Sequence, residues 1–509
     1  MDWLDFHAAR QPDKVAIQIV GDKSISYATL DQTSRQMAQW FRSQGLRDGD
    51  TIALLLENDI LTPTLWWAAR RAGLYYVPLG TRLRPGEIAY ILSDSGARAL
   101  IAAPSLMSLA DAARAEWPDA DACLFATPGD AAAGWVGVGS DEAPTIAGQA
   151  AVVGREIIYS SGTTGRPKGI RRALTGVDQA RTIPVFEQKL RLACALDRDS
   201  VYLSVSPLYH ATGRYVMRIV EGGGTAVILS QFDAAEALAA IEKYHITHSQ
   251  WVPTMFTRLL DLPAAKRSEH DLSSHRVALH AAAPCPVDVK RAMIAWWGPI
   301  LSEYYGGSEN AGVTFITAEE WLQHPGSVGR SITGAIHILD EDGSNRELAT
   351  GEIGLIYFEG GVPFQYINQD TPSAALSDRG YATYGDLGHV DSDGYLFISD
   401  RRSDLIIRGG VNIYPREVEL ALEAHPAVRE VAVVGVSDAE YGQQVKAVVV
   451  PAENCIDDDR LRDMLVAHCR AQLASIKCPT IIDFAADLPR NENGKLLKRV
   501  LRADHATVP

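Results

Sequence analysis

The sequence has little of what marks secreted, membrane-spanning or zinc-binding proteins. Its six cysteines are scattered over 509 residues, and no two of them form a Cys-x-x-Cys pair. That spacing fits reduced thiols better than a disulfide framework or a zinc site. No apolar run is long enough to cross a bilayer, and the first residues lack the apolar segment of a signal peptide. We therefore expect a cytoplasmic protein without an integral membrane segment.

Basic residues are also fewer than acidic residues. The chain has 63 acidic and 48 basic residues, which gives a formal net charge of −15. A surface of that sign repels phosphate backbones, so we expect no nucleic-acid partner. A site for any small anion must be made locally positive by a few well-placed side chains, a metal ion or backbone N–H groups.

The residues that are present indicate an α/β protein with more than one domain. A chain of this length exceeds what a single hydrophobic core supports. From about residue 150 onward, short β-rich runs alternate with helix-like stretches such as 234–244 and 287–297, which is typical of parallel sheets. The β-rich runs are Glu156–Ser160, Val201–Val205, Thr225–Leu229, His248–Val252, Arg276–His280 and Ile300–Tyr305.

Changes of pattern divide the rest of the chain. Residues 126–149, rich in Ala, Gly, Asp and Pro, read as a loose surface connection. Between about 335 and 400, short strands with Asp-Gly turns suggest a small antiparallel or barrel-like unit. A compact β/α pattern then returns, with strands near 429–436 and 444–450 and a helix near 458–473. The predicted domain boundary therefore lies at Arg401–Asp404.

The segment from Ile157 to Gly169 is the strongest local signal of function. A β-rich run ends in a stretch of hydroxyl and glycine residues and then meets Lys168. Glycines let backbone N–H groups point inward as an anion-binding nest, and the serine and threonine hydroxyls add donors. The spacing is not that of a Walker A loop. A glycine-rich surface turn is the plainer alternative, but so many consecutive residues of this chemistry favour a phosphate loop.

This loop resembles the signature of the adenylate-forming superfamily, which includes acyl-CoA synthetases, luciferases and peptide-synthetase adenylation domains. Further segments resemble the family's motifs in the same order and spacing. Together, these motifs resemble those of bacterial fatty-acyl-CoA or aryl-CoA ligases. These segments are Pro207–His210, Tyr304–Glu309, Tyr384–Gly388, Asp400–Glu417 and Pro489–Lys495. The resemblance implies an AMP-forming carboxylate–CoA ligase that uses ATP, Mg²⁺ and coenzyme A. Such an enzyme turns a carboxylic acid into acyl-AMP and then into acyl-CoA.

The resemblance also implies the architecture. The N-terminal adenylation domain, residues 1–401, is expected to be α/β, with two parallel-sheet subdomains and a small β-barrel-like subdomain. A small mobile α+β domain, residues 402–509, is expected to follow and to carry the catalytic lysine. The sequence leaves a homodimer open.

Roles for individual residues in the first reaction step follow from the same resemblance. Lys495 is expected to bridge the carboxylate and the α-phosphate, although a solvated lysine in a basic tail is its plainer interpretation. Glu309 is the expected Mg²⁺ ligand, and Ser308 stands where the family usually has threonine. The implied ATP-binding residues are Ser161, Gly162, Thr163, Thr164, Gly165, Lys168, Ala282, Ala283, Tyr305, Ser308, Asp386 and Arg401.

The acid is expected to bind in an apolar pocket. His210 stands either at the mouth of this pocket or in the core as a satisfied histidine. The stretch 209–217 lacks the aspartate with which peptide-synthetase domains hold an amino group, so a fatty or arylalkanoic acid is favoured over an amino acid. Arg214 either pairs with a polar or second carboxylate group of the substrate or, more simply, points outward from a helix start. The expected lining is Tyr209, Thr212, Arg214, Tyr215, Trp251, Val252, Gly306 and Gly307.

In the second step the resemblance implies a rotation of the C-terminal domain. The hinge is expected at Ser403, where relatives commonly carry Asp or Lys, and Arg408, Gly409 and Gly410 are expected to line the thiol tunnel. Three other functions share the motifs: an acyl-AMP ligase that loads a carrier protein, a luciferase-like oxygenase, and a non-catalytic nucleotide-binding homologue. Retention of the charged motif residues speaks against the last one. These residues are Lys168, Glu309, Asp386, Arg401 and Lys495.

Overall fold

The described parts of the chain form two compact units in this computed structural model. The first comprises Met1–Gln323 and Gly361–Ala374, and the second comprises His324–Gly360 and Ala375–Pro509. The boundary that we predict near residue 401 lies inside the second unit and stays a prediction. The structure describes residues 3–120, 123–128, 135–138, 150–160, 167–177, 185–210, 213–340, 344–361, 365–368, 376–377, 379–401, 404–408, 411–438, 441–452, 455, 459–490 and 496–503.

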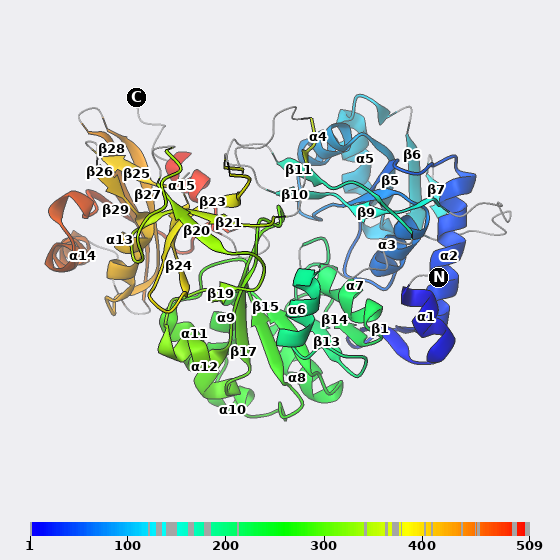
Figure 1. Ribbon diagram of the computed structural model, residues 1–509, viewed down its shortest axis with the longest axis horizontal. Helices are drawn as coiled ribbons and strands as arrows, with labels where there is room; N and C mark the ends of the chain where they lie inside the picture. The colour runs from blue at the N-terminus through cyan, green and yellow to red at the C-terminus, as the bar shows by residue number, and fades with distance from the viewer. Residues whose placement is uncertain are drawn as a thin grey trace. The chain divides into compact units, whose positions relative to one another are not determined.

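The first unit contains a large, mainly parallel sheet. Its order within this unit is β18-β17-β16-β15-β13-β14-β1-β2, and all neighbours from β17 to β1 pair in parallel. This confirms the parallel α/β sheet predicted from the β-rich runs. Figure 1 shows most of these strands in green, with α8, α9 and α11 nearby. The strands are β1 (Val15–Ile19), β2 (Ser24–Ser26), β13 (Val201–Ser204), β14 (Thr225–Ile228), β15 (His248–Trp251), β16 (Val277–His280), β17 (Leu301–Tyr305) and β18 (Thr314–Ile316).

Helices connect these strands, as parallel pairing requires. The predicted helices 234–244 and 287–297 are present as α8 (Ala234–Lys243) and α11 (Val287–Trp297). Asp233 caps α8 by accepting a hydrogen bond from the N–H of Glu236. The others are α1 (Trp3–Arg10), α2 (Tyr27–Ser43), α6 (Val185–Ala193), α7 (Gly213–Glu221), α9 (Pro253–Leu260), α10 (Ala264–Arg267) and α12 (Ala318–Gln323).

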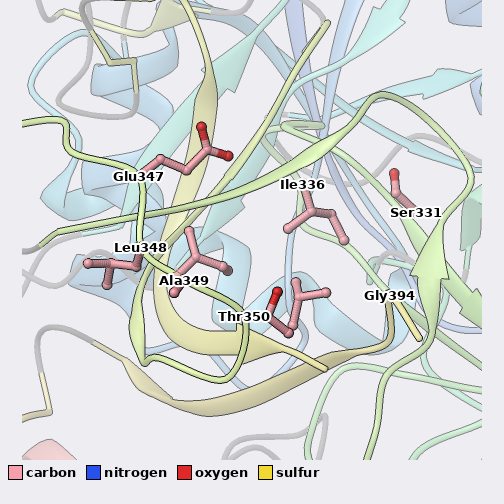
Figure 2. Close-up of a pocket in the computed structure, with 9 residues that line it drawn as sticks. Ser331, Ile336, Glu347, Leu348, Ala349, Thr350 and Gly394 are labelled. Carbon is pink, nitrogen blue, oxygen red and sulfur yellow. The ribbon is translucent and has the colours of Figure 1, made fainter. Parts of the chain in front are cut away.

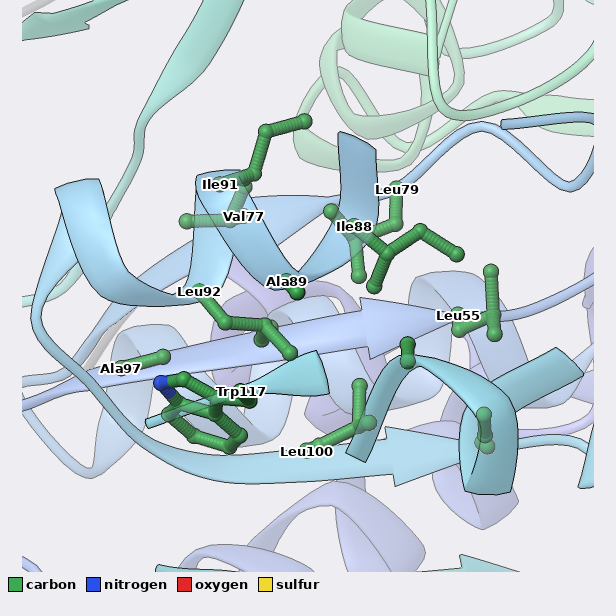
Figure 3. Close-up of a cluster of buried hydrophobic side chains, with 14 of the residues drawn as sticks. Leu55, Val77, Leu79, Ile88, Ala89, Ile91, Leu92, Ala97, Leu100 and Trp117 are labelled. Carbon is green, nitrogen blue, oxygen red and sulfur yellow. The ribbon is translucent and has the colours of Figure 1, made fainter. Parts of the chain in front are cut away.

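A second parallel sheet lies in the same unit, in the order β7-β6-β5-β3-β4-β9. Apolar side chains from α4 and from its central strands form one buried cluster with Trp117 (Figure 3). Burial of such side chains is the main force that holds helix and sheet together. The elements are β3 (Thr51–Leu55), β4 (Tyr75–Pro78), β5 (Ala97–Ala102), β6 (Leu124–Pro128), β7 (Val136–Val138), β9 (Arg155–Glu156), α3 (Leu61–Arg71), α4 (Pro85–Ser95), η1 (Pro104–Leu106) and α5 (Met107–Glu116).

The predicted loose connection 126–149 is wrong where the structure describes it. β6 ends and β7 lies within this stretch, and both strands belong to the parallel sheet. Trp135 is the physical reason, because its ring packs 5.3 Å from that of Phe125 and its Nε1 donates to Asp111 at 2.9 Å. The contacts of this buried tryptophan thus hold β7 in the sheet, although the composition of the segment suggests a loop.

The second unit contains the small antiparallel sheet predicted between 335 and 400, in the order β20-β21-β23-β24. A further sheet, β27-β28-β29, carries α13 and α14 and forms the apolar core of the C-terminal part. Within the described ranges, no helix of the protein is both long enough and apolar enough to span a membrane. The elements are β19 (Arg330–Ser331), β20 (Ile336–Leu339), β21 (Gly354–Phe358), β23 (Ala382–Val390), β24 (Leu396–Arg401), β25 (Ile406–Arg408), β26 (Val411–Ile413), α13 (Pro415–Glu423), β27 (Val428–Asp438), β28 (Gly442–Pro451), α14 (Asp459–Gln472), η4 (Ser475–Lys477), β29 (Ile481–Phe484) and α15 (Lys498–Ala503).

Candidate active site

Several predicted site residues follow the carboxyl ends of neighbouring parallel strands. His210 comes after β13, Val252 after β15, Ala282 after β16, and Tyr305 closes β17. In open α/β sheets the carboxyl ends of the strands meet at one edge, and ligands bind there. Ala282 has a φ of 77°, which only a few non-glycine residues adopt. The backbone therefore bends sharply where the adenine of ATP is expected to lie. The segments that we expect to bind the substrate acid and the adenine of ATP thus lie at one edge of the sheet.

The strands on either side of the predicted phosphate loop form an antiparallel β-hairpin. β10 (Ile158–Ser160) pairs antiparallel with β11 (Lys168–Arg171), and Ser160 is opposite Lys168. The predicted β-run from Glu156 to Ser160 is in fact divided, since Glu156 belongs to β9 in the parallel sheet. Buried Ile157 lies between the two pieces, and its N–H donates to the carbonyl of Tyr76. The loop residues Ser161, Gly162, Thr163, Thr164 and Gly165 lie outside the described residues.

Gly169 closes the base of this hairpin. A Cβ at this position would lie 2.8 Å from Tyr159 Cζ and 2.9 Å from Ile367 Cδ1, so a larger residue would have to displace one of these side chains. Tyr159 donates its hydroxyl to Asp94 at 2.7 Å, which ties the hairpin to α4. The N–H of Ile367 donates to the carbonyl of Gly169 at 2.9 Å. The two ends of the phosphate loop are therefore rigidly supported.

A third strand brings an unpredicted tyrosine to this hairpin. β22 (Gln365–Tyr366) pairs with β11, with Tyr366 opposite Ile170. The hydroxyl of Tyr366 donates to Glu309 Oε1 at 3.3 Å, and Lys168 Nζ lies 5.4 Å from the centroid of its ring. Burial and the nearby Glu309 carboxylate raise the pKa of Tyr366 to about 12. Tyr366 thus contacts both Lys168 and Glu309, the two charged residues that are expected to lie at the phosphates of ATP.

The strand after the phosphate loop also reaches the motif that follows β17. Arg172 donates through Nη2 to the carbonyl of Ser308 at 2.6 Å. Together with the contact between Tyr366 and Glu309, this bond brings two motifs separated by more than a hundred residues of sequence into one site. Tyr366 and Arg172 therefore link the segment Ser308–Glu309 to the hairpin that carries Lys168.

The residues predicted to hold the acid differ in exposure. Tyr209 and His210 are half-buried with ring centroids 4.4 Å apart, and burial lowers the pKa of His210 to about 3. The imidazole is therefore neutral at physiological pH. Tyr215 is buried and stacks on Tyr202. Gly306 is exposed, Gly307 is half-buried, and Thr212 lies outside the described residues.

Trp251 has no exposed surface, and its role in the acid pocket stays a prediction. Its ring packs among Phe232, Phe256 and Trp297, and its Nε1 donates to Ser249 at 2.5 Å. Val252, the next residue, is buried as well. These contacts support the carboxyl end of β15 from inside the core.

Arg214 pairs with another element of the protein. Its Nε lies 3.2 Å from Glu156 Oε1, which belongs to β9 of the other parallel sheet. Burial would raise the pKa of Glu156, but Arg214, with Arg172 and Arg70 nearby, outweighs burial and lowers it. Tyr76 donates its hydroxyl to Glu156 at 3.4 Å. Glu156 is the partner that the sequence analysis missed, because only the tertiary fold brings it to α7.

In the second unit, Asp386 and Arg401 are cross-strand partners of β23 and β24. Asp386 is buried and lies in β23. Gly385 has a φ of 76°, and its N–H donates to Thr383 Oγ1 at 3.0 Å. The side chain of Arg401 lies outside the described part of the structure.

Lys495 lies outside the described residues, but the chain on both sides of it is anchored. Arg490 forms a β-bridge with Leu496 and donates to Glu430 at 2.8 Å. Lys498 Nζ lies 2.8 Å from Glu419 Oε1, which helps to raise the pKa of this lysine against the opposing effect of burial. The role of Lys495 therefore stays a prediction, while the described residues on either side of it are tied to the C-terminal part of the chain.

The residues expected at the hinge and the thiol tunnel are described only in part. Ser403, Gly409 and Gly410 lie outside the described residues. Arg408 and Val411, on either side of these glycines, are opposite each other in the antiparallel pair β25–β26. Arg408 donates through Nη1 to the carbonyl of Ile476 at 2.9 Å.

Two other features of the second unit involve none of the predicted site residues. A pocket of about 350 Å³ lies beside β20 and the turn between β23 and β24 (Figure 2). His324 Nδ1 lies 3.1 Å from Asp391 Oδ2, and Asp393 is close to both. Asp391 already accepts backbone hydrogen bonds from Asp393 and Tyr395, so this group is explained as a turn. The pocket lining is Ser331, Ile336, Ile338, Glu347, Leu348, Ala349, Thr350, Val390 and Gly394.

Comparisons with known proteins cover nearly the whole chain. The model of the AMP-binding enzyme family matches residues 4–365, and that of the AMP-binding enzyme C-terminal domain matches residues 417–495. The chain is 30% identical over 499 residues to the long-chain-fatty-acid–CoA ligase FadD13 of Mycobacterium tuberculosis, covering 96% of this chain and 95% of that protein. It is 32% identical over 509 residues to a feruloyl-CoA synthase of an Amycolatopsis species, covering 98% of each. The crystal structure of ATP-bound MatB from Rhodopseudomonas palustris has a TM-score of 0.83 at 29% identity, over 100% of this chain and 99% of that one.

Proposed function

Because this chain belongs to the family of AMP-binding enzymes, we propose that it is an AMP-forming CoA ligase for a fatty or arylalkanoic acid. It activates the carboxylic acid with ATP to an acyl-adenylate and releases pyrophosphate. It then transfers the acyl group to CoA and releases AMP. The observation that carries the proposal is the full-length match to two CoA ligases, which includes both the AMP-binding and the C-terminal domain.

The first step brings two anions together, so its barrier is largely electrostatic. The carboxylate oxygen attacks the α-phosphorus, and the bond to pyrophosphate breaks. Lys168 is the first residue of β11, opposite Ser160, and Lys495 precedes Leu496, which forms a β-bridge with Arg490. We assign both to neutralising the negative charge that accumulates in this step.

Glu309 would hold Mg²⁺ at the phosphates. The residues fit such an ion, because a carboxylate is a hard oxygen ligand and Tyr366 orients it with a hydrogen bond. When bound, Mg²⁺ would draw negative charge from the phosphate oxygens. Tyr366 and Arg172 hold the Glu309 segment against the phosphate hairpin, so the two halves of the site are positioned before substrate arrives.

The base and ribose have their own residues in this proposal. Tyr305 stacks on adenine, and the backbone at Ala282 and Ala283 lines the other side. Asp386 accepts hydrogen bonds from the ribose hydroxyls, supported by its cross-strand partner Arg401. Their positions along the chain match the family's motifs, which is the support for this assignment.

The thiol step needs a different arrangement of the C-terminal domain. We assign the hinge to Ser403 and the thiol tunnel to Arg408, Gly409 and Gly410, because glycines have no side chains and leave room for a narrow arm. The hinge assignment is supported by its place two residues after the end of β24 in the sequence, because a few residues at the end of an element absorb such motions.

The acid is proposed to be a monocarboxylic acid with an apolar body. Arg214 is the charged residue of the expected pocket lining, and Glu156 already pairs with it. A second carboxylate on the substrate would have to compete with that partner. The aromatic and glycine residues of the lining suit an alkyl chain or a ring.

Two assays test the function in sequence. Exchange of labelled pyrophosphate into ATP, measured with a panel of long-chain fatty, hydroxycinnamic and arylacetic acids, should depend on the acid. CoA should then release AMP and form a thioester. Exchange without any acyl-CoA would favour the loading of a carrier protein, and the absence of exchange with every acid would contradict the proposal.

Lys495→Ala tests the assignment of the cation. Adenylation should slow by a factor of several hundred or more, which corresponds to about 3–4 kcal/mol for the loss of one such group. Transfer from preformed acyl-AMP to CoA should persist, because that step does not use this lysine. Arg499→Ala is the matched control, since it removes an exposed cation four residues away. Undiminished adenylation by Lys495→Ala would remove the basis of the assignment.

A further inference from the structure

A buried ion pair lies beside a segment that we assign to the adenine of ATP. Lys290 donates through Nζ to Glu303 Oε2 at 2.6 Å. Their exposed fractions are 1% and 6%, so both charges lie inside the core of the first unit. Lys290 belongs to α11, which connects β16 to β17, and Glu303 belongs to β17, two residues before Tyr305. The ion pair thus ties the connecting helix to the end of a strand that carries an assigned adenine residue.

The register of the sheet brings the neighbouring strand to the same ion pair. Side chains alternate along a strand, so Glu303 and Tyr305 share one face of β17. His280, the last residue of β16, is opposite Glu303 in the parallel pair, and its Nε2 lies 3.4 Å from Glu303 Oε2. The segment Ala281–Ala283, which includes the other residues assigned to adenine, follows His280 directly. Glu303 therefore contacts the ends of both strands that lead to the adenine segments.

Aromatic rings surround these polar groups. Lys290 Nζ lies 4.7 Å from the centroid of the Trp321 ring, and the ring of His280 lies 5.6 Å from that of Phe256. Burial raises the pKa of Glu303, and Lys290 opposes that rise. Burial, together with the charge of Lys290, holds the pKa of His280 well below its ordinary value, so the imidazole is neutral. Lys290 is therefore the cation that balances the Glu303 carboxylate.

A buried ion pair adds direction more than stability. The cost of removing two charges from water offsets their attraction, and apolar residues of similar volume are often equally stable or more stable. The packing of α11 therefore does not require these charges. A hydrogen bond, however, is satisfied only over a narrow range of distances and angles, whereas the burial of apolar surface is non-directional. The pair thus fixes where the strand ends lie.

We propose that Lys290 is a positioning residue for the adenine of ATP and acts through its ion pair with Glu303. The pair holds the end of β17, so that the ring of Tyr305 keeps the orientation in which it stacks on the base. Through the contact of Glu303 with His280, it also holds the point at which Ala281–Ala283 leaves β16. The inference rests on the proposed function, in which these two segments enclose adenine. It adds a residue of the connecting helix to the groups on which ATP binding depends.

The double variant Lys290→Met, Glu303→Met tests the role of the pair, because it removes both charges and keeps side chains of similar length. In pyrophosphate exchange the KM for ATP should rise about tenfold, in line with the weakening of one base–aromatic stack. The KM for the acid and the maximal rate should not change, since the lost interaction is the same in the ground state and the transition state. A urea titration should show equal or greater stability. A pair that served stability alone would not give this combination.

Two further variants support this test. Arg291→Met removes the exposed cation that follows Lys290 on α11, and it should keep the wild-type KM for ATP. Lys290→Met alone replaces the double variant if the latter does not fold, because Glu303 can then take up a proton and stay neutral. The single variant should show the same rise in the KM for ATP.

The outcomes separate this inference from the function on which it rests. A wild-type KM for ATP in the charge-free variant would refute the positioning role while the ligase stands. Equal rises in the KM values for ATP and for the acid, together with lower stability, would refute it as well. Calorimetric titration with AMP needs no acid, and the Kd of the variant should exceed that of wild type by the same factor. If the wild-type protein binds AMP but shows no exchange with any acid, the proposed function fails, and this titration still tests the ion pair.

Discussion

Tyr366 orients Glu309 through a single hydroxyl group. Since burial and the Glu309 carboxylate raise the pKa of Tyr366 to about 12, the hydroxyl stays protonated and donates at any working pH. Tyr366→Phe removes this donor and keeps the ring beside Lys168. We expect adenylation to slow by about tenfold, as for the loss of one hydrogen bond to a charged group, and the Mg²⁺ concentration at half-maximal rate to rise. Pyrophosphate exchange against Mg²⁺ concentration measures both effects.

Tyr244→Phe is the matched control for this prediction. Its hydroxyl accepts a hydrogen bond from the N–H of Gly21, far along the chain from every motif of the site. This variant should keep the wild-type Mg²⁺ dependence. A Tyr366→Phe protein that has the same Mg²⁺ requirement as wild type would show that Glu309 is oriented by other groups.

Arg214 is predicted to matter for stability more than for choice of substrate. In Arg214→Leu, Glu156 loses its ion-pair partner while it stays half-buried. We expect the free energy of unfolding to fall by about 1–2 kcal/mol, because an unpaired and partly buried charge is poorly solvated. The ranking of acids should not change. A urea titration measures the first effect, and kcat/KM over the acid panel measures the second.

The double variant Glu156→Gln, Arg214→Leu makes this prediction specific. It removes both charges and should recover part of the lost stability, whereas two independent defects would add. A changed ranking of acids in Arg214→Leu, with selective loss of acids that carry a second polar group, would instead show that the arginine contacts substrate.

At the scale of elements, the phosphate hairpin depends on the close approach that Gly169 allows. In Gly169→Ala the new methyl group meets the side chains of Tyr159 and Ile367 at less than 3 Å, so the Tyr159 ring, which bonds to Asp94, or the Ile367 side chain must move. We expect adenylation to fall by about tenfold or more, because a displacement of about 1 Å in a positioning element costs this much in rate or more. Steady-state pyrophosphate exchange with saturating acid is the measurement.

Gly176→Ala is the control for the hairpin. Gly176 lies in β12 (Thr175–Gly176), which pairs with β8 (Val152–Val153), and a Cβ there would meet nothing within 4 Å. Its adenylation rate should equal that of wild type. Equal rates for the two variants would mean that the base of the hairpin tolerates an added methyl group and does not position the loop.

The sequence was sufficient for the elements whose pattern is local. The strands from Val201 to Tyr305 were predicted to within one residue at most ends, because β-rich runs bounded by helices leave few alternatives. The membership of the adenylate-forming superfamily is confirmed as well. Tyr366 and Glu156 could not be found in this way, since both contacts depend on which strands pair across distant parts of the chain. Trp135 likewise overrode the loop-like composition around it.

At the scale of the whole molecule, several buried histidines make the first unit sensitive to acid. Burial lowers the pKa of His275 to about 3, and it lowers the pKa values of His248 and His280 as well. In the unfolded chain a histidine titrates near 6.5. As the pH falls below that value, these histidines become protonated in the unfolded state but stay neutral in the folded state. The free energy of unfolding therefore decreases. Stability should therefore be greatest above pH 6.5 and fall towards pH 3.

His275→Gln tests this linkage at one position. A histidine that stays neutral in the fold should account for a loss of about 2 kcal/mol between pH 7 and pH 5, because the unfolded form alone becomes protonated over that interval. Glutamine does not titrate, and its amide can still bond to Ser249, which lies 2.6 Å from His275 Nε2. The variant should lose correspondingly less stability over the same interval, whatever its stability at pH 7. Urea titrations at pH 7, 6 and 5 give the slope of the free energy of unfolding against pH for the wild type and for the variant. If the two proteins have equal slopes, the proton uptake of unfolding takes place elsewhere and His275 is protonated in the fold.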